Sequence, residues 1–101
     1  MKVYRVVFAP QAQGQLLDLS AYITEAASAS VAERFTDAII TYCEGLRTFP
    51  ERGMRRDDIR PGLRVTNYRG STIIAFAVDA TQVTIVGIYY GGLDYESLLN
   101  A

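Results

Sequence analysis

Histidine and tryptophan are absent from this sequence of 101 residues, and cysteine occurs only once. Without histidine, the chain lacks the side chain that most often acts as a general base or a metal ligand near neutral pH. The single cysteine, Cys43, cannot form an internal disulfide and has no histidine to activate it, so we interpret it as a small core residue. We therefore expect no metal site, no cofactor and no nucleophilic cysteine.

Long apolar runs are also missing. No segment approaches the roughly 18 residues that a membrane-spanning helix needs. At the start of the chain, charged residues interrupt the apolar residues of segment 1–8, which differs from the pattern of a secretory signal. Together with the lone cysteine, these features predict a cytoplasmic protein that does not bind a membrane.

Net charge is small but unevenly distributed. The total of −1 argues against bulk binding of polyanions, and we expect no direct sequence-specific nucleic-acid binding. Between residues 52 and 69, which we call the arginine segment, six arginines face two aspartates, so this segment carries +4 and the rest of the chain −5. Guanidinium groups suit carboxylates or phosphates, which makes the segment a candidate partner surface. The alternative is a solvated loop whose arginines pair locally with Asp57 and Asp58.

The composition is typical of a globular protein, with half of the residues hydrophobic and 21% charged. A chain of this length buries about 65% of the surface that it exposes when unfolded, which is enough for one modest core. We find no internal repeat or low-complexity tract. We therefore expect a single domain over residues 1–101.

Two helices are predicted after an opening strand. Segment 2–8 is rich in β-branched and aromatic residues and reads as a strand, and Pro10 suits the first turn of the helix that follows. A capping box, Ser30 with Glu33, predicts the start of a second helix, and Pro50 predicts its end. Apolar residues step by three or four along both segments, so the helices should pack as a hairpin. The two stripes are Ala9, Ala12, Leu16, Leu19 and Ile23, then Val31, Phe35, Ala38, Tyr42, Leu46 and Phe49.

Three further strands are predicted in the second half. Charges, prolines and glycines indicate an exposed loop over residues 51–62. Segments 63–68, 72–78 and 83–89 follow, separated by short turns, which predicts a three-stranded antiparallel meander. Segment 93–99 is either a short helix or a tail that folds back through its leucines.

The order of elements predicts an α+β fold with one antiparallel sheet and both helices on one face, because each amphipathic helix needs an apolar surface to cover. The opposite face should stay available to a partner. Arg64 alternates with Leu63 and Val65, which places it on that open face.

Partner or target contacts are predicted at six residues, and no catalytic residue is predicted. The tyrosines are candidates because this residue type is enriched at protein interfaces, although core packing is the alternative for each. Tyr89 and Tyr90 are consecutive, so they should point to opposite faces and at most one shares the side of Arg64. The six residues are Arg56, Arg60, Arg64, Tyr68, Tyr89 and Tyr90.

Six segments, in this order and spacing, resemble the RelE/ParE family of toxins from type II toxin–antitoxin systems. They are residues 8–12, 18–23, 32–35, 46–53, 61–64 and 83–94. The resemblance implies a stable hetero-oligomeric complex with an antitoxin, whose extended segment wraps the toxin and blocks its target surface.

The family splits into two activities. RelE-like members resemble ribosome-dependent mRNA endonucleases, which need positioned acids, bases and cations. Here the last strand reads Val86 to Tyr90 without a cation, and arginine is a poor base. ParE-like members look like inhibitors of DNA gyrase that act by binding, so the missing groups favour a binder over an enzyme. Tyr90 replaces the histidine often found after the last strand of that branch.

We therefore expect a toxin that inhibits DNA gyrase and is neutralised by a ParD-like antitoxin. Two alternatives stay open. One is a RelE-like endonuclease, for which an exposed Arg64 could stabilise phosphate charge. The other is a non-toxic module that keeps only antitoxin binding.

Overall fold

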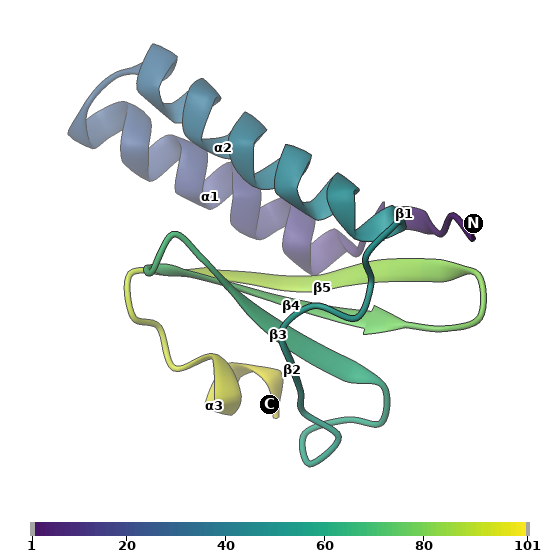
Figure 1. Cartoon of the computed structure of the whole chain (residues 1–101). Helices are drawn as coiled ribbons and strands as arrows, with labels where there is room; N and C mark the ends of the chain where they lie inside the picture. The colour runs from purple at the N-terminus through teal and green to yellow at the C-terminus, as the bar shows by residue number, and fades with distance from the viewer. Residues whose placement is uncertain (1, 101) are drawn as a thin grey trace.

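The computed structural model describes residues 2–100, so Met1 and Ala101, the ends of the expected domain, lie outside the described residues. Figure 1 shows how the helices and strands are arranged. In chain order the elements are β1 (Arg5–Phe8), α1 (Pro10–Ala26), α2 (Ala29–Glu44), the 3₁₀ turn η1 (Gly45–Arg47), β2 (Met54–Arg55), β3 (Leu63–Tyr68), β4 (Thr72–Val78), β5 (Gln82–Tyr90) and α3 (Tyr95–Leu99).

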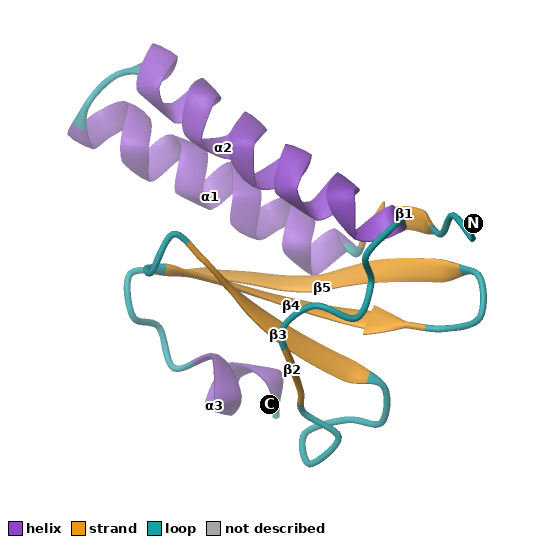
Figure 2. Cartoon of the chain, viewed as in Figure 1, coloured by secondary structure: helices purple, strands orange, loops and turns teal. Residues whose placement is uncertain are grey.

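The five strands form one sheet in the order β1-β5-β4-β3-β2 (Figure 2). The predicted meander is confirmed, because β3, β4 and β5 pair antiparallel in succession. The sheet as a whole is mixed rather than antiparallel, since β1 lies parallel to β5 with Val6 opposite Val83. Side-chain alternation is the same whichever way a neighbouring strand runs, so the sequence pattern of β1 could not indicate this direction.

The predicted loop over 51–62 contains a short strand. β2 pairs antiparallel with β3, placing Met54 opposite Val65. Just before it, Gly53 has a φ of +74°, and a Cβ there would lie 2.3 Å from the carbonyl oxygen of Val65. Only glycine allows the chain to approach β3 so closely, and this approach makes the added strand possible.

Helices α1 and α2 form the predicted hairpin and cover one face of the sheet (Figure 1). In α1, the buried side chains Ala12, Leu19 and Ile23 belong to the predicted stripe. In α2 the predicted residues Phe35 and Tyr42 pack against the core, but the fully buried positions are Ala32, Ile39 and Cys43. Val31, the first residue of the predicted stripe, is 37% exposed. Apolar residues lie on both sides of the buried positions of α2, so spacing alone did not distinguish the buried residues from their neighbours.

The start of α2 also differs from the prediction. The helix begins at Ala29, and the side chain of Ser28 caps it by accepting a hydrogen bond from the Val31 amide at 3.2 Å. Ser30 therefore lies inside the first turn and does not form a capping box with Glu33. Two serines, two positions apart, offer alternative caps, and the turn out of α1 determines which serine is used.

The opposite face of the sheet is covered in part, contrary to the expectation that it stays open. Helix α3 folds back beneath the sheet, on the side away from α1 and α2 (Figure 1). Leu99 is 2% exposed and packs in a second core with Leu63, Val65 and Tyr89. The short-helix alternative for the C-terminal segment is thus the one that forms.

A β-bulge in β5 determines which side chains face the hairpin. Ala75 of β4 pairs with Gly87 and Phe76 pairs with Ile85, so Val86 is an extra residue in β5. The extra residue shifts the alternation of side chains between the two faces of the sheet. As a result, Ile85 and Ile88, which are three positions apart, both belong to the core beneath the helices. The bulge therefore places Ile88 and Tyr90 on the side of the hairpin.

Candidate functional site

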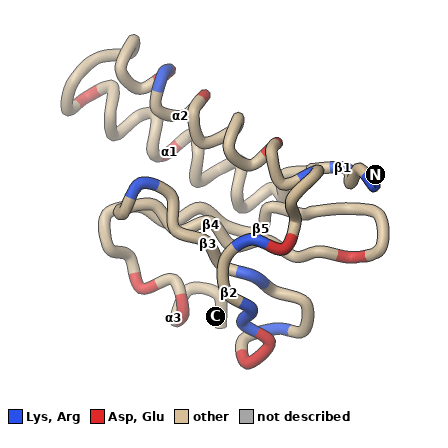
Figure 3. Tube along the Cα trace, in the orientation of Figure 1, with Lys and Arg blue, Asp and Glu red and all other residues tan. Residues whose placement is uncertain are grey.

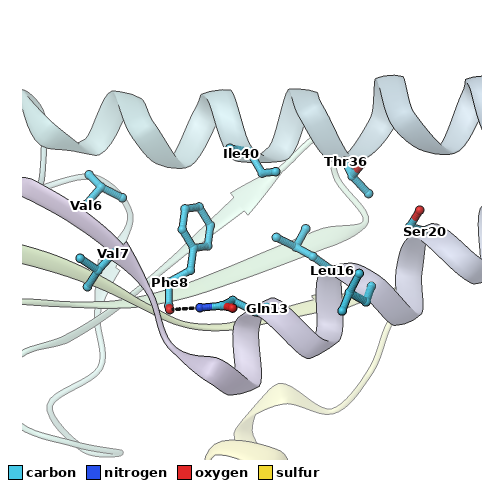
Figure 4. Close-up of a pocket in the computed structure, with 9 residues that line it drawn as sticks. Val6, Val7, Phe8, Gln13, Leu16, Ser20, Thr36 and Ile40 are labelled. Carbon is cyan, nitrogen blue, oxygen red and sulfur yellow. Dashed lines mark hydrogen bonds between the residues drawn. The ribbon is translucent and has the colours of Figure 1, made fainter.

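A hollow of about 740 Å³ lies between β1 and the helical hairpin. Figure 4 shows side chains from β1, α1 and α2 pointing into it, mostly apolar ones. The side chain of Leu17 is 72% exposed at the edge of this hollow, although burying a leucine side chain is energetically favourable. We call this hollow the β1 groove. Its lining is Val6, Val7, Phe8, Gln13, Leu16, Leu17, Ser20, Thr36 and Ile40.

Beside the groove runs an open strand edge. In a parallel pair, alternate residues direct both backbone groups toward the neighbouring strand. Arg5 and Ala9 donate to the carbonyls of Thr81 and Ile85 of β5 and its turn, so the backbone groups of Val6 and Phe8 point away from the sheet. Those groups are a template for an added strand.

The ends of this edge are partly occupied. The Tyr4 amide donates to the Arg47 carbonyl at 2.8 Å, and the Gln13 side chain donates to the Phe8 carbonyl at 2.8 Å. Between them, Val6 presents both backbone groups outward. The available edge is therefore short and suits one or two main-chain hydrogen bonds from a partner.

Arg56, the first predicted contact residue, is held inside the molecule. Its guanidinium donates two hydrogen bonds to Asp58, at 2.9 and 2.8 Å, one to Glu96 at 2.6 Å and one to the Tyr95 hydroxyl at 3.1 Å. Only 16% of its side chain is exposed. Arg56 thus ties the loop to α3, a contact that joins residues about 40 positions apart in sequence.

The electrostatics of this cluster favour the charged forms. The hydrogen bond to Asp58, followed by that to Glu96, raises the pKa of Arg56 further above its high ordinary value. The same bond holds the pKa of the Asp58 carboxyl below its usual range. Both groups therefore stay ionised near neutral pH.

Arg60 and Arg64 also bind backbone carbonyls of the protein itself. Arg60 donates to the Leu99 carbonyl at 2.9 Å and so caps the end of α3. Arg64 donates to the carbonyls of Arg52 and Glu51, at 3.0 and 2.9 Å. Figure 3 shows several basic residues around this loop and β3, while others lie on α2 and near the N-terminus.

The predicted face of Arg64 is wrong. Arg64 pairs with Phe76 across β3 and β4, and directly paired residues lie on the same face. Phe76 is in the core beneath the hairpin, so Arg64 lies on the hairpin side, beyond the part that the helices cover. Leu63 and Val65 point instead toward α3, because this second face has its own apolar core.

The three predicted tyrosines lie in different places. Tyr68 packs against Tyr42 with ring centroids 4.9 Å apart and ring planes tilted by 51°. Tyr89 is 1% exposed in the second core, while Tyr90 lies on the hairpin side against Phe35 at 5.7 Å. As predicted, Tyr89 and Tyr90 point to opposite faces, and only Tyr90 shares the side of Arg64.

The structure does not gather the six predicted residues at one place. The groove and the open edge of β1 were missed by the sequence analysis. One signal was available, since Leu17 follows Leu16 but lies outside the predicted stripe of α1. Isolated exposed apolar residues are common on protein surfaces, so this signal by itself does not mark a contact surface.

Neither a metal site nor a membrane-spanning helix is present among the described residues. Across residues 2–100, no three side chains of His, Cys, Asp or Glu gather closely enough to hold a metal ion. Over the same range, no helix has the length and apolar character that crossing a bilayer requires.

Comparison with known proteins places this sequence within one family. Residues 6–95 match the family described as the ParE toxin of the type II toxin–antitoxin system parDE. No curated protein sequence matches.

Two solved structures share the fold. The chromosomal ParDE toxin–antitoxin system from P. aeruginosa matches with a TM-score of 0.74 at 18% identity, over 87% of this chain and 96% of that one. The RelBE2 toxin–antitoxin complex from Mycobacterium tuberculosis matches with a TM-score of 0.65 at 22% identity, over 92% of this chain and 97% of that one.

Proposed function

This chain belongs to the ParE toxin family of type II toxin–antitoxin systems, and we propose that it binds and inhibits DNA gyrase in the cytoplasm until a ParD-like antitoxin neutralises it. The observation that carries this proposal is the family match over residues 6–95, nearly the whole chain. Inhibition by binding needs no hydrolytic groups, which agrees with a chain that contains no histidine.

The β1 groove supports an antitoxin as the partner. An apolar hollow beside an open strand edge can take an extended segment, whose main chain bonds to Val6 while its apolar side chains fill the hollow. Both similar solved structures are described as a toxin–antitoxin system or complex. We place the antitoxin segment along β1, where it would cover Leu17.

The arginine segment supports acidic groups on the same antitoxin. Arg55 leaves 69% of its side chain exposed and pairs only with Asp57 among the residues described. Arg52 lies over the Tyr42 and Phe49 rings at 5.5 and 5.6 Å, at the surface of the same loop. A partner carboxylate can reach these cations without breaking the contacts that hold α3.

The endonuclease alternative loses its main support. It relied on Arg64 standing free on an open face, yet the guanidinium donates to two backbone carbonyls on the hairpin side. The similarity to the RelBE2 complex concerns the fold and fits this alternative only in part. Mapping mRNA ends after expression in cells separates this alternative from gyrase inhibition, and unchanged growth on expression without antitoxin would indicate the non-toxic module.

A supercoiling assay tests the proposal. Purified toxin added to DNA gyrase, ATP and relaxed plasmid should reduce supercoiling or accumulate cleaved DNA, and prior addition of the antitoxin should prevent both. The matched control is toxin denatured and left unfolded in the same buffer. Normal supercoiling at a large excess of folded toxin would refute gyrase as the target.

A further inference from the structure

We propose that a second cleft, between α1 and the end of β5, binds an arginine side chain of the target protein. The cleft has a volume of about 370 Å³ and is separate from both the β1 groove and the arginine segment. We call it the tyrosine cleft. Its principal residues are Asp18, Leu19, Tyr22, Ile88, Tyr90 and Leu93. The inference that the cleft binds an arginine side chain depends only on this geometry, whereas the identity of the target protein rests on the proposed function.

One wall comes from the spacing of residues in α1. Asp18 and Tyr22 are four positions apart, so they lie on the same helical face, one turn from each other. Segment 18–23 is among those that resemble the family, and neither the groove nor the second core uses these two side chains. Their role is therefore unassigned by the rest of the structure.

The other wall depends on the β-bulge. Because Val86 is an extra residue, Ile88 and Tyr90 both point toward the hairpin. The ring centroids of Tyr90 and Tyr22 are then 6.5 Å apart, with the rings tilted by 54°. Phe35 packs edge-on against Tyr90, with ring centroids 5.7 Å apart. Two tyrosine rings thus stand close together at the mouth of the cleft.

The cleft combines a buried apolar floor with exposed apolar walls. Leu19 and Ile88 are 6% and 4% exposed, while Tyr22 and Leu93 are 62% and 54% exposed. An aromatic ring and a leucine left open around a concave surface indicate a contact site. The methylene stem of a long side chain fits such a floor, with its charged head at the mouth.

The negative charge of Asp18 in the cleft favours a cationic ligand. Asp18 is its one charged lining residue, and among residues 2–100 no lysine or arginine pairs with it. Helix α1 contains no basic residue at all, only Asp18 and Glu25 as charges. Arginine fits better than lysine, because a planar guanidinium can stack on a tyrosine ring while it bonds a carboxylate with two N–H groups.

The two hollows can be occupied at the same time. The β1 groove uses Leu16 and Ser20 of α1, while the tyrosine cleft uses Asp18 and Tyr22. A shift of two residues turns the helix by about 200°, so the hollows lie on opposite sides of α1. An acidic antitoxin attracted to the arginine segment does not compete for a cleft whose own charge is negative.

Titration by nuclear magnetic resonance tests the cleft directly. The probe is the peptide acetyl-Leu-Arg-Leu-amide, added to ¹⁵N-labelled toxin, and the matched ligand control replaces arginine with uncharged citrulline. We expect saturable shifts at the amides of Asp18, Tyr22 and Tyr90 with a Kd of about 1–10 mM, the range for a ligand with few contacts. Asp18→Asn should weaken binding by about fivefold, and Asp37→Asn, an exposed acid of α2, should leave it unchanged.

Several outcomes would overturn the proposal. These are shifts elsewhere on the surface, equal binding of the citrulline peptide, or equal binding of a lysine peptide. The supercoiling assay separates this inference from the proposed function. If the wild-type toxin fails to inhibit gyrase but binds the arginine peptide, only gyrase as the target is refuted. If Asp18→Asn inhibits gyrase as well as the wild type does, the cleft is not where the target binds.

Discussion

Replacing Gly53 with alanine should destabilise the protein strongly, for two reasons that can be separated. The residue has a φ of +74°, which costs a non-glycine residue about 1–2 kcal/mol. In addition, the new Cβ would lie 2.3 Å from the carbonyl oxygen of Val65, and backbone cannot rotate away as a side chain does. Overpacking of this kind costs about 1–3 kcal/mol, so the free energy of unfolding should fall by about 3 kcal/mol in total.

Gly70→Ala is the matched control. Its φ of +79° imposes the same backbone strain, but nothing lies within 4 Å of the added Cβ. Only the strain should remain, and the loss should be about 1 kcal/mol. The difference between the two variants therefore measures the close approach of segment 51–53 to β3.

Urea unfolding followed by circular dichroism measures both variants, and thermal unfolding provides a second value. A loss of 3 kcal/mol corresponds to a fall in Tm of roughly 12–24 °C for a domain of this size. Gly53→Ala should also loosen Arg64, because the carbonyls that it binds belong to Glu51 and Arg52, next to the shifted residue. Equal losses for Gly53→Ala and Gly70→Ala would refute the packing of β2 against β3.

Four further predictions concern separate parts of the molecule. Val6→Pro removes an outward N–H that β5 does not use, so the fold should survive while antitoxin affinity, measured by calorimetry, falls at least about tenfold. Arg60→Glu and Arg64→Glu should both weaken the antitoxin complex in the same titration, by placing negative charge within the arginine segment. Leu99→Ala should lower the free energy of unfolding by about 2 kcal/mol, because its side chain is 2% exposed in the second core. Burial, with a smaller effect of Glu44, raises the pKa of the Cys43 thiol from 9.0 to about 12. The thiol therefore ionises at lower pH in the unfolded chain than in the folded protein. The free energy of unfolding should fall above pH 9, by about 1.4 kcal/mol between pH 8 and pH 10.

Three of these predictions have a control variant, and the fourth has an outcome that would refute it. Val7→Pro removes an N–H directed at β5 and should unfold β1, unlike Val6→Pro. Leu98→Ala alters a side chain that is 45% exposed and should change stability by less than about 0.5 kcal/mol. The extra loss above pH 9 should disappear in Cys43→Ala, and a loss of equal size in that variant would assign it to other groups. Unchanged antitoxin affinity in both glutamate variants would remove the electrostatic part of the antitoxin interface.

Local patterns in the sequence were enough to predict the helices and strands of the hairpin and the meander, because these depend on neighbours within a few residues. The family resemblance depended on the order and spacing of six such segments along the chain. Prediction failed where two local solutions were close in energy. Ser28 and Ser30 are both good caps, and Val31 and Ala32 are both apolar, so the turn after α1 and the packing on the sheet decided between them. The candidate site was predicted less well, since Arg56 and Arg60 hold α3 rather than standing free at the surface.

By itself, the sequence determined the types of element, their order and the absence of histidine chemistry, since period, caps and composition are properties of short segments. Tertiary structure alone decided which faces meet. The parallel pairing of β1 created the open edge, the bulge at Val86 turned Tyr90 toward Tyr22, and the return of α3 engaged Arg56. These outcomes depend on contacts between residues far apart in the chain, and no local period records such contacts.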